Sequence, residues 1–508
     1  MIKVSLLIIS LLITVSSFAQ KGDTVSIQQH VLEREQLKLH FIEPLFLNPS
    51  LSNYRYSTSL STISVKGSYD DQYQSILAQT GDGWKGYQIN AQSYVRLSNN
   101  SSVWGNAYFQ KGERQNVLWN ENSDFDKVYP YVMADTIGGD MKSNTYYFNG
   151  GYAHKIKKWT FAGEFSYRAL MEHRIVDPRP KNTIADLQGR FGVSYEIIPS
   201  YALGLSVEAH KYKQNSNIQY FNELGVSKTF HLQGLGTSYI RFDGTRNSVN
   251  YQGNLFGASL NLMPIGKKCG WFGSLSYQKY YLDKILPSIN DLSLNELNED
   301  GLTVDLGWMA MPSSLSQWGV KGHFSFSERK GKEFVYGDAS SNQYLCIAVK
   351  EPFDRKLLNG FLSAFYERNQ SRVFTFGGNM LVGLSSHKEI HKGSLNEMNV
   401  DALNFNLSAV SLLKWKSNLL RLKIGGQYQN VLDDNMKIKH VTHPFANDIL
   451  LRNFSIMSSN SLGYYFSARW STLVGKDNML YIMSSLAQKY YKNDLNGYEV
   501  TVNIGVDF

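Results

Sequence analysis

The sequence contains Tyr498-Glu499-Val500-Thr501-Val502-Asn503-Ile504-Gly505-Val506-Asp507-Phe508, in which every even-numbered residue is aromatic or aliphatic and every odd-numbered residue is not. Because successive side chains of a β-strand point to opposite faces, this stretch predicts a strand with one apolar face and one polar face. Soluble strands average about 5–6 residues, whereas a tilted strand needs about 9–11 to cross a bilayer. The length of the stretch therefore favours a membrane-crossing strand.

The same alternation recurs along the chain, for example in residues 161–169, 187–196, 203–210 and 420–429. Beyond Gln20 we find no internal linker and no long helical stripe. Alternation is weak around 357–367 and 479–490, which makes the strand count less definite there. We predict an all-β fold, a transmembrane antiparallel up-and-down β-barrel of about eighteen strands, with sixteen as the alternative.

The segments between these stretches alternate between short and long. The expected short connections are 99–102, 156–158, 198–200, 264–270, 311–316, 368–371, 416–418 and 474–478. The expected long ones lie near 114–144, 171–184, 214–247, 284–300, 330–356, 385–399 and 431–458. Short periplasmic turns and long extracellular loops are typical of outer-membrane barrels. We therefore expect an integral outer-membrane protein with both chain termini in the periplasm.

Tryptophan supports this interpretation, since seven of the nine tryptophans lie close to short connections. Six of these seven also share the apolar face of their strand, whereas Trp104 does not. The six are Trp159, Trp271, Trp308, Trp318, Trp415 and Trp470. Indole prefers the boundary between lipid tails and headgroups, so these residues are expected to form an aromatic girdle.

The composition excludes other classes of protein. Only 19% of the 508 residues are charged, and Tyr and Phe are abundant at 32 and 27. Disordered chains need the opposite balance. A helical membrane protein needs apolar runs of about 18 residues or more, and no such run occurs. The formal net charge of +8 is compatible with nucleic-acid binding, but export from the cell excludes most nucleic-acid partners.

The N-terminal part predicts export. Lys3, an apolar run over 4–15 and Ser17-Phe18-Ala19 have the order of a cleaved signal peptide over residues 1–19. Residues 20–53 are too polar to span a bilayer, so they are expected to form either a periplasmic tail or a small plug in the lumen. Residues 54–508 are then the transmembrane barrel.

The terminal strand resembles the assembly signal of outer-membrane proteins, which ends on an aromatic residue. The positions that match it are Tyr498, Val500, Val502, Ile504, Val506 and Phe508. Ala19-Gln20 and Phe46-Leu47-Asn48-Pro49-Ser50 also resemble elements of Bacteroidota barrels, although Ser50 replaces the usual Ala. The whole chain looks like an uncharacterised Bacteroidota outer-membrane barrel family of the domain-of-unknown-function type. This resemblance implies as partners the barrel-assembly machinery and, by association, a TonB-dependent receptor or surface lipoprotein.

The polar faces of the strands are expected to line the lumen, next to an outer surface in contact with membrane lipid and lipopolysaccharide. The lumen-facing candidates of both charges include Arg168, Arg190, Glu208, Asp305, Arg421, Lys423 and Arg469. An open aqueous pore and a salt-bridged, largely blocked lumen fit this pattern equally well. We expect a channel or an accessory component of nutrient or iron uptake, with a structural or secretion-associated anchoring barrel as the alternative.

Catalytic and cofactor motifs give little support to an enzyme. His154, His173, His210 and His323 lie on or near strands, but no nucleophile, zinc or nucleotide motif surrounds them, so an outer-membrane hydrolase is less favoured. His387 and His391 are weak candidates for a metal site, since their spacing suits two ligands only on a helix. We expect no catalytic residues and no cofactor.

Overall fold

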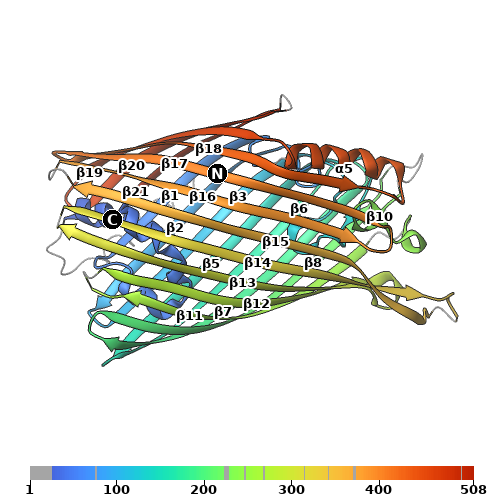
Figure 1. Cartoon of the computed structure of the whole chain (residues 1–508), viewed down its shortest axis with the longest axis horizontal. Coiled ribbons are helices and arrows are strands. Elements are labelled where there is room, and N and C mark those ends of the chain that lie inside the picture. The colour runs from blue at the N-terminus through green and yellow to red at the C-terminus, as the bar shows by residue number, and fades with distance from the viewer. Residues whose placement is uncertain are drawn as a thin grey trace, which may run out of the picture.

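Eighteen antiparallel strands form one closed barrel in the computed structural model, which describes residues 26–74, 77–221, 228–244, 248–266, 269–313, 315–340, 343–369, 373–492 and 495–508 (Figure 1). The first strand pairs with both the second and the last, which closes the sheet. The predicted fold class and strand number are confirmed. The predicted signal peptide, residues 1–19, lies outside the described residues.

Each barrel strand pairs with its neighbours in chain order. The strands are β1 (Leu60–Asp71), β2 (Gly83–Ser98), β3 (Ser101–Val117), β5 (Gly139–Ile156), β6 (Trp159–His173), β7 (Arg179–Ile198), β8 (Tyr201–Gln219), β11 (Ser248–Pro264), β12 (Gly270–Leu286), β13 (Leu292–Ser313), β14 (Ser316–Tyr336), β15 (Cys346–Asn369), β16 (Phe374–His391), β17 (Asn396–Trp415), β18 (Asn418–Lys437), β19 (Ser461–Val474), β20 (Asn478–Tyr491) and β21 (Asn496–Asp507).

Many strands are longer than the eleven or so residues expected, and β15 reaches 24 residues. The expected long loops near 171–184, 284–300, 330–356 and 385–399 are therefore wrong as loops, because most of their residues are strand. Beyond the bilayer, water and protein replace lipid on the outer face. Apolar side chains are then no longer required there, and the alternation that marks a strand in the sequence fades.

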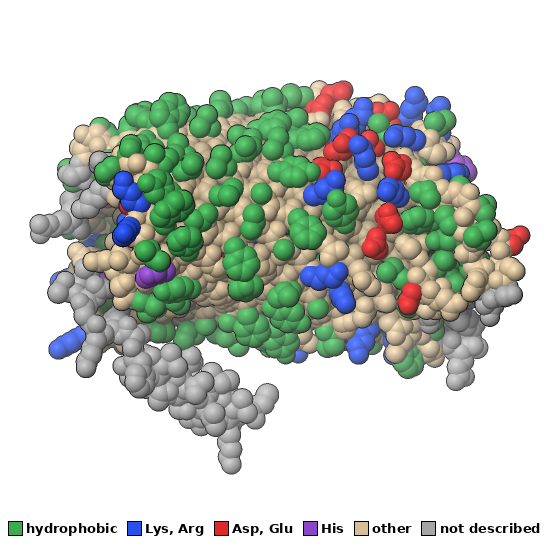
Figure 2. Space-filling model, turned by 90° about the horizontal axis from the view of Figure 1, so that it is seen from below, with side chains coloured by type: hydrophobic (Ala, Val, Ile, Leu, Met, Phe, Trp, Pro, Cys, Tyr) green, Lys and Arg blue, Asp and Glu red, His purple; other side chains and the backbone are tan. Residues whose placement is uncertain are grey.

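The outer surface carries an apolar belt, and charged side chains gather toward one end of the barrel (Figure 2). A row of charged residues marks the change on five neighbouring strands: Lys279, Asp300, Glu328, Lys356 and Lys388 lie directly opposite one another from β12 to β16. On β13 and β14 the pairing continues well past this row. An apolar belt around a closed barrel is the signature of a transmembrane barrel of the outer-membrane type.

The two ends of the barrel differ. The terminal end holds the first residues of β1, the last residues of β21 and short turns such as Lys157-Lys158 and Lys416-Ser417. Lys157 and Lys416 have φ angles of 57° and 51°, the left-handed conformation that tight hairpins use. The loop end holds the long segments 118–138 and 438–460, and residues 228–244 between β8 and β11.

Two groups of residues lie outside the barrel wall, one at the terminal end and one at the loop end. Residues 27–54 form α2 (Ile27–Arg34), α3 (Leu37–Phe41) and the 3-10 helices η1 (Glu43–Leu47) and η2 (Pro49–Tyr54), here called the plug. Loop-end elements are α4 (Phe125–Val128), β4 (Met133–Ala134), β9 (Phe230–Gly234), β10 (Thr237–Ser238), η3 (Ile240–Phe242), η4 (Pro287–Ile289) and α5 (Pro444–Met457). β4, β9 and β10 form a separate three-stranded sheet. Within the described residues, every helix is too short or too polar to span a bilayer.

The belt predicts different outcomes for one substitution at two exposed apolar sites. Leu205 is 51% exposed within the belt on β8, and Ile347 is 63% exposed on β15, well past the charged row. Leu205→Arg should destabilise the barrel by about 2–4 kcal/mol, because charge near mid-membrane is unfavourable, and Ile347→Arg by about 0–1 kcal/mol. Urea unfolding in lipid vesicles measures both values. Equal tolerance of the two substitutions would mean that water, not lipid, contacts Leu205.

Candidate functional site

The plug lies inside the terminal end of the barrel, where the blue helices of Figure 1 are seen through the strands. Its apolar residues Phe41, Leu45 and Leu51 form a core with inward-facing residues of the wall. The ring of Phe41 lies 5.9 Å from that of Phe272 and 4.7 Å from that of Phe365, between centroids. The terminal end of the lumen therefore has a hydrophobic core, built from strand residues that face inward.

Glu35, between α2 and α3, lies between two lumen-facing arginines. Its carboxylate oxygens are 2.9 Å from Arg421 Nε and 2.7 Å from an Arg469 Nη. Arg469 also donates to Asp507 at 2.6 Å. Burial pushes the pKa of Glu35 up, but the two guanidinium groups outweigh it and hold the pKa below its usual value. Glu35 is therefore ionised at neutral pH and links the plug to β18 and β19.

A second attachment is made by Asn48, Pro49 and Ser50, whose side chains are fully or almost fully buried. Asn48 Oδ1 accepts hydrogen bonds from Ser50 N at 3.1 Å and Ser50 Oγ at 2.8 Å, and so caps η2. Asn48 Nδ2 donates to Asn261 Oδ1 at 3.0 Å. This contact needs glycine in the wall, because a Cβ at Gly192 or Gly204 would lie 2.2 Å or 2.6 Å from the Asn48 amide. We call residues 48–54 the anchor.

α2 and α3 are packed less closely against the wall than the anchor is. A cavity of about 330 Å³ adjoins the junction between them, lined by Glu35, Gln36 and Leu37 on one side and Glu367 and Arg421 on the other. Glu367 accepts a hydrogen bond from Leu37 N at 2.7 Å, which satisfies a free amide at the start of α3. Ile27 and Val31 of α2 and Phe41 of α3 pack against the wall, so the segment has apolar contacts beside these polar ones. We call α2 and α3 together the gate segment, because the cavity lies at their junction.

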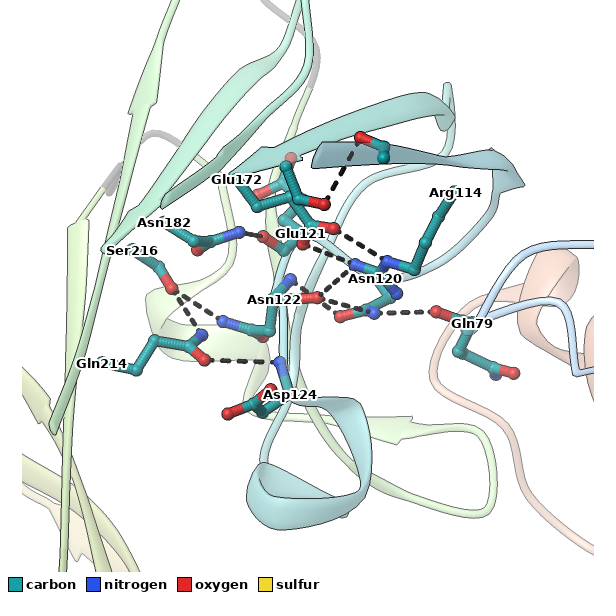
Figure 3. Close-up of polar contacts among 12 residues, drawn as sticks. Gln79, Arg114, Asn120, Glu121, Asn122, Asp124, Glu172, Asn182, Gln214 and Ser216 are labelled. Atoms are coloured by element: carbon teal, nitrogen blue, oxygen red, sulfur yellow. Dashed lines mark hydrogen bonds and ion pairs between the residues drawn. The ribbon is translucent and has the colours of Figure 1, made fainter. Parts of the chain in front are cut away.

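At the loop end, residues 118–138 between β3 and β5 fold into the lumen and are here called the inner loop. Asn122 is fully buried and lies at the centre of a network of hydrogen bonds (Figure 3). Asn122 Nδ2 donates to Ser216 Oγ at 2.9 Å, and Asn122 Oδ1 accepts from Met133 N at 2.8 Å. Asn120 Nδ2 donates to Gln79 O at 2.7 Å, and Asn182 Nδ2 donates to Glu121 O at 2.7 Å. Side-chain amides of the inner loop and of β7 therefore join this loop to β7, to β8 and to the backbone at Gln79.

One buried cation faces two buried carboxyl groups beside this network. An Arg174 Nη lies 2.6 Å from Asp135 Oδ2 and 3.7 Å from Glu121 Oε1, and all three side chains are fully buried. A single guanidinium cannot neutralise two carboxylates, so one of them must be protonated. Burial, together with the adjacent Asp135, raises the pKa of Glu121 well above its usual value. Glu121 is therefore the neutral acid of the pair.

Between the plug and the inner loop lies a polar cavity of about 680 Å³, here called the central cavity. Its wall carries both charges, including Lys66, Asp70, Arg168 and Glu499 from the strands. The inner loop contributes residues 123–127 to the lining. A cavity of this size lies within the range of about 300–1,000 Å³ found for small-molecule sites.

The structure places the predicted lumen-facing residues inside the barrel but in separate clusters. Arg168 contacts Asp124 of the inner loop and lies 3.2 Å from Asp186. Arg190 joins Glu208 at 3.1 Å and Glu164 at 3.4 Å. Asp305 contacts His323 at 2.9 Å, Arg421 and Arg469 bind Glu35, and Lys423 Nζ lies 5.2 Å from the Tyr465 ring centroid. These residues form a series of local ion pairs along the wall.

The predicted girdle and assembly residues lie on the outer face. Trp159, Trp271, Trp415 and Trp470 are exposed there, while Trp308 and Trp318 cover each other with centroids 5.0 Å apart. Trp104 points inward, as its phase indicated, and donates to Glu164 at 2.6 Å. Tyr498, Val500, Val502, Ile504 and Val506 are likewise exposed, and the backbone of Phe508 pairs with Ser61. Their roles as girdle and assembly signal stay predictions.

The histidines are engaged individually. His387 and His391 are part of β16, so they lie on strand rather than in a loop, and their nearest acids differ: Glu389 at 2.8 Å and Glu333 at 3.6 Å. Across the described residues, no three His, Cys, Asp or Glu side chains are grouped to hold a metal ion. His210 contacts Asp186, and His154 bonds Ser101 Oγ at 2.7 Å on the outer face.

Sequence reasoning missed the partners that the plug and the inner loop supply to the wall. Glu35, Glu121 and Asp135 lie outside any alternating stretch, so no periodicity marks them as buried. The resemblance of Asn48-Pro49-Ser50 to a Bacteroidota element was the one available signal, and it points to the anchor. Gly192 and Gly204, which lie diagonally to each other on β7 and β8, gave no signal of their own.

A profile of one protein family, described as a family of unknown function (DUF6850), matches residues 48–508. The chain belongs to this family. The expected membership in a domain-of-unknown-function family is therefore confirmed, and the matched part of this DUF6850 chain begins at the anchor and includes all of the barrel. No curated protein matches the chain.

Several solved structures are distantly similar to this DUF6850 chain. One is the ferric yersiniabactin uptake receptor FyuA from Yersinia pestis, at 9% identity and a TM-score of 0.44, covering 86% of this chain and 62% of the receptor. The chain thus spans less than two thirds of that receptor. The ferric preacinetobactin receptor BauA from Acinetobacter baumannii gives 8% identity and a TM-score of 0.41, covering 89% and 79%. The outer-membrane transporter YddB from Escherichia coli gives 8% and 0.38, covering 89% and 81%.

The buried acid predicts that docking of the inner loop depends on pH. A group whose pKa is raised by folding stabilises the folded form below its unfolded pKa, and this stabilisation is lost as pH rises through the folded pKa. Hydrogen exchange of residues 118–138, corrected for intrinsic pH dependence, should therefore accelerate as pH rises through the raised pKa of Glu121. Glu121→Gln should remove this acceleration, and Asp126→Asn, at an exposed acid of the same loop, should not. Unchanged pH dependence in Glu121→Gln would contradict this assignment.

Proposed function

We propose that the protein is a gated uptake channel of the outer membrane, in which the gate segment controls passage through the lumen. The observation that supports this most is the contrast within the plug. The anchor is buried and closely fitted against glycines. The gate segment also packs apolar side chains on the wall, but it adjoins an open cavity and is held there by the polar contacts of Glu35 and Glu367. Displacement of α2 and α3 about the anchor would join the central cavity to the terminal end.

The central cavity favours a channel over a barrel whose lumen is completely filled with protein. Its lining is polar and carries both charges, and it lies between the gate segment and the inner loop. Barrels of sixteen to eighteen strands are wide enough for an aqueous lumen when nothing occupies it. The proposal assigns no catalytic activity to the protein.

In this proposal the terminal end lies in the periplasm and the loop end outside the cell, as the short turns and long loops indicate. The charged row on the outer face then lies at the level of lipopolysaccharide headgroups. Lys356 and Lys388 lie side by side in it and could meet their phosphates. A periplasmic gate would also be within reach of a partner, such as a TonB-dependent receptor or a lipoprotein, that opens it.

Removing the charge of Glu35 should open the channel. Glu35→Gln leaves Arg421 and Arg469 without their shared carboxylate, and breaking a buried ion pair costs about 3–5 kcal/mol. The lumen is partly solvated, so we expect a smaller effect, at least about tenfold in open probability, or about 1.4 kcal/mol. Single-channel recording in planar bilayers at neutral pH measures it. Glu43→Gln is the matched control, because Glu43 is an exposed plug acid whose one ion pair within the described part of the chain is with Arg55, at 3.3 Å.

The pH dependence follows from the lowered pKa of Glu35. A group whose pKa is lowered by folding stabilises the folded form at pH values above the pKa of the unfolded chain. This stabilisation is lost as pH falls through the pKa of the folded form. The wild-type channel should therefore open only in acid, below the usual carboxyl range, while Glu35→Gln is open throughout. A barrel that stays electrically silent in Glu35→Gln, and after deletion of residues 27–47, would instead support the anchoring function.

A further inference from the structure

A second cavity, of about 360 Å³, lies at the loop end and is here called the mouth cavity. The inner loop, the segment 232–237 and α5 line it together with the loop-side parts of β15, β16 and β17. It shares Gln74, Thr80, Phe125 and Asp126 with the central cavity, so the two adjoin. A molecule held in the mouth cavity therefore lies next to the central cavity.

Most of the mouth cavity is apolar. Its lining includes Trp119, Val132, Leu232, Met398, Ile449 and Leu450. Trp119, Ala134, Phe230 and Ala446 form a small hydrophobic core behind this lining, with the rings of Trp119 and Phe230 5.5 Å apart. This apolar core lies away from the bilayer and fixes the shape of the cavity. Small-molecule sites are usually pre-formed in this way.

The polar groups of the cavity are mostly paired with one another. Glu389 accepts from Tyr129 Oη at 2.6 Å and from His387 Nε2 at 2.8 Å. Asn453 Nδ2 donates to Gln79 Oε1 at 2.7 Å. A ligand would therefore find few free hydrogen-bonding groups among these side chains.

Asp126 and Arg355 are the exceptions. Asp126 is exposed and lines both cavities, whereas Arg355 is nearly buried on β15. Its Nε is buried and has no hydrogen-bond partner among the described residues, although the guanidinium lies 3.8 Å from Glu299 and over the Tyr129 ring at 5.7 Å. Glu299 and Glu389 offset its positive charge. The Nη groups of Arg355 likewise make no hydrogen bond among the described residues, and Glu299 is too distant to accept one. The site thus offers guanidinium donors whose charge is offset, which matches an uncharged acceptor such as a carbonyl oxygen.

We propose that the mouth cavity binds an uncharged, mostly apolar small molecule whose single hydrogen-bond acceptor meets Arg355. This inference deepens the proposed function, because it names the class of molecule that the channel would admit. A carboxylate would meet the acids that already offset Arg355, and an ammonium group would meet the guanidinium itself. Either charged ligand would also lose its hydration in an apolar space.

The test uses 6-propionyl-2-dimethylaminonaphthalene, an uncharged fluorophore with one carbonyl acceptor, and the full chain in lipid nanodiscs. Binding should be saturable, with a blue-shifted emission above that of empty nanodiscs. Leu450→Trp fills the cavity and should weaken binding at least about tenfold. Leu451→Trp is the matched control, since Leu451 is the next residue of α5, 47% exposed and outside the lining, and it should leave binding unchanged.

Arg355→Lys keeps the charge but removes the guanidinium donors, and should weaken binding about tenfold in a protein that still shows the wild-type heat-modifiable band. Carboxylate and trimethylammonium analogues of the naphthalene should bind at least about tenfold more weakly than the ketone. Equal binding by Leu450→Trp and Leu451→Trp, or tighter binding of a charged analogue, would overturn the inference. Saturable binding to a barrel that is silent in Glu35→Gln would contradict the channel alone. Conductance without such binding would contradict the mouth site alone.

Discussion

Every backbone N–H and C=O of a strand in a bilayer must be paired by the protein, because lipid offers no hydrogen bonds. Closure of β1 onto β21 satisfies this requirement around the whole barrel. Closure also turns one face of each strand inward, where the polar side chains gather. The lumen then needs partners for its charges, and the arrangement of the plug and the inner loop follows from that need.

The two ends of the lumen meet this need in different ways. At the terminal end, Glu35 brings a carboxylate to two arginines that would otherwise face each other across β18 and β19. At the loop end, Asn122 and its neighbours use neutral amides, and Arg168 pairs with Asp124. Arg174 lies between Asp135 and the protonated Glu121. A change of pH alters the charge at both ends, at Glu35 and at Glu121, but the inner loop is also held by neutral amides that do not titrate. The terminal end is accordingly the better place for a gate.

The barrel could be predicted from the sequence because lipid imposes a strict rule on one face. Val500 and Val502 are apolar for the same reason as Leu205, so the period of two, the strand number and the closed fold could all be derived. The extended strands past Lys356 could not, since nothing in water requires alternation there. The lumen-facing arginines could be located for the same reason as the lipid-facing residues, but their partners Glu35 and Asp124 could not. Those acids lie in segments without a period, and only the fold brings them to the wall.

The central claim is that α2 and α3 must leave the wall for the channel to conduct. A Cβ at Gly377 would lie 2.8 Å from Leu37 Cδ1, so positions 37 and 377 adjoin and are chosen for a cysteine pair that is to join α3 to β16. The measurement is conductance of Leu37→Cys/Gly377→Cys combined with Glu35→Gln, with Cys269 and Cys346 replaced by serine. The account predicts a silent channel when the pair is oxidised and full Glu35→Gln conductance after reduction. Equal conductance in both redox states, with the disulfide verified by mass spectrometry, would contradict it.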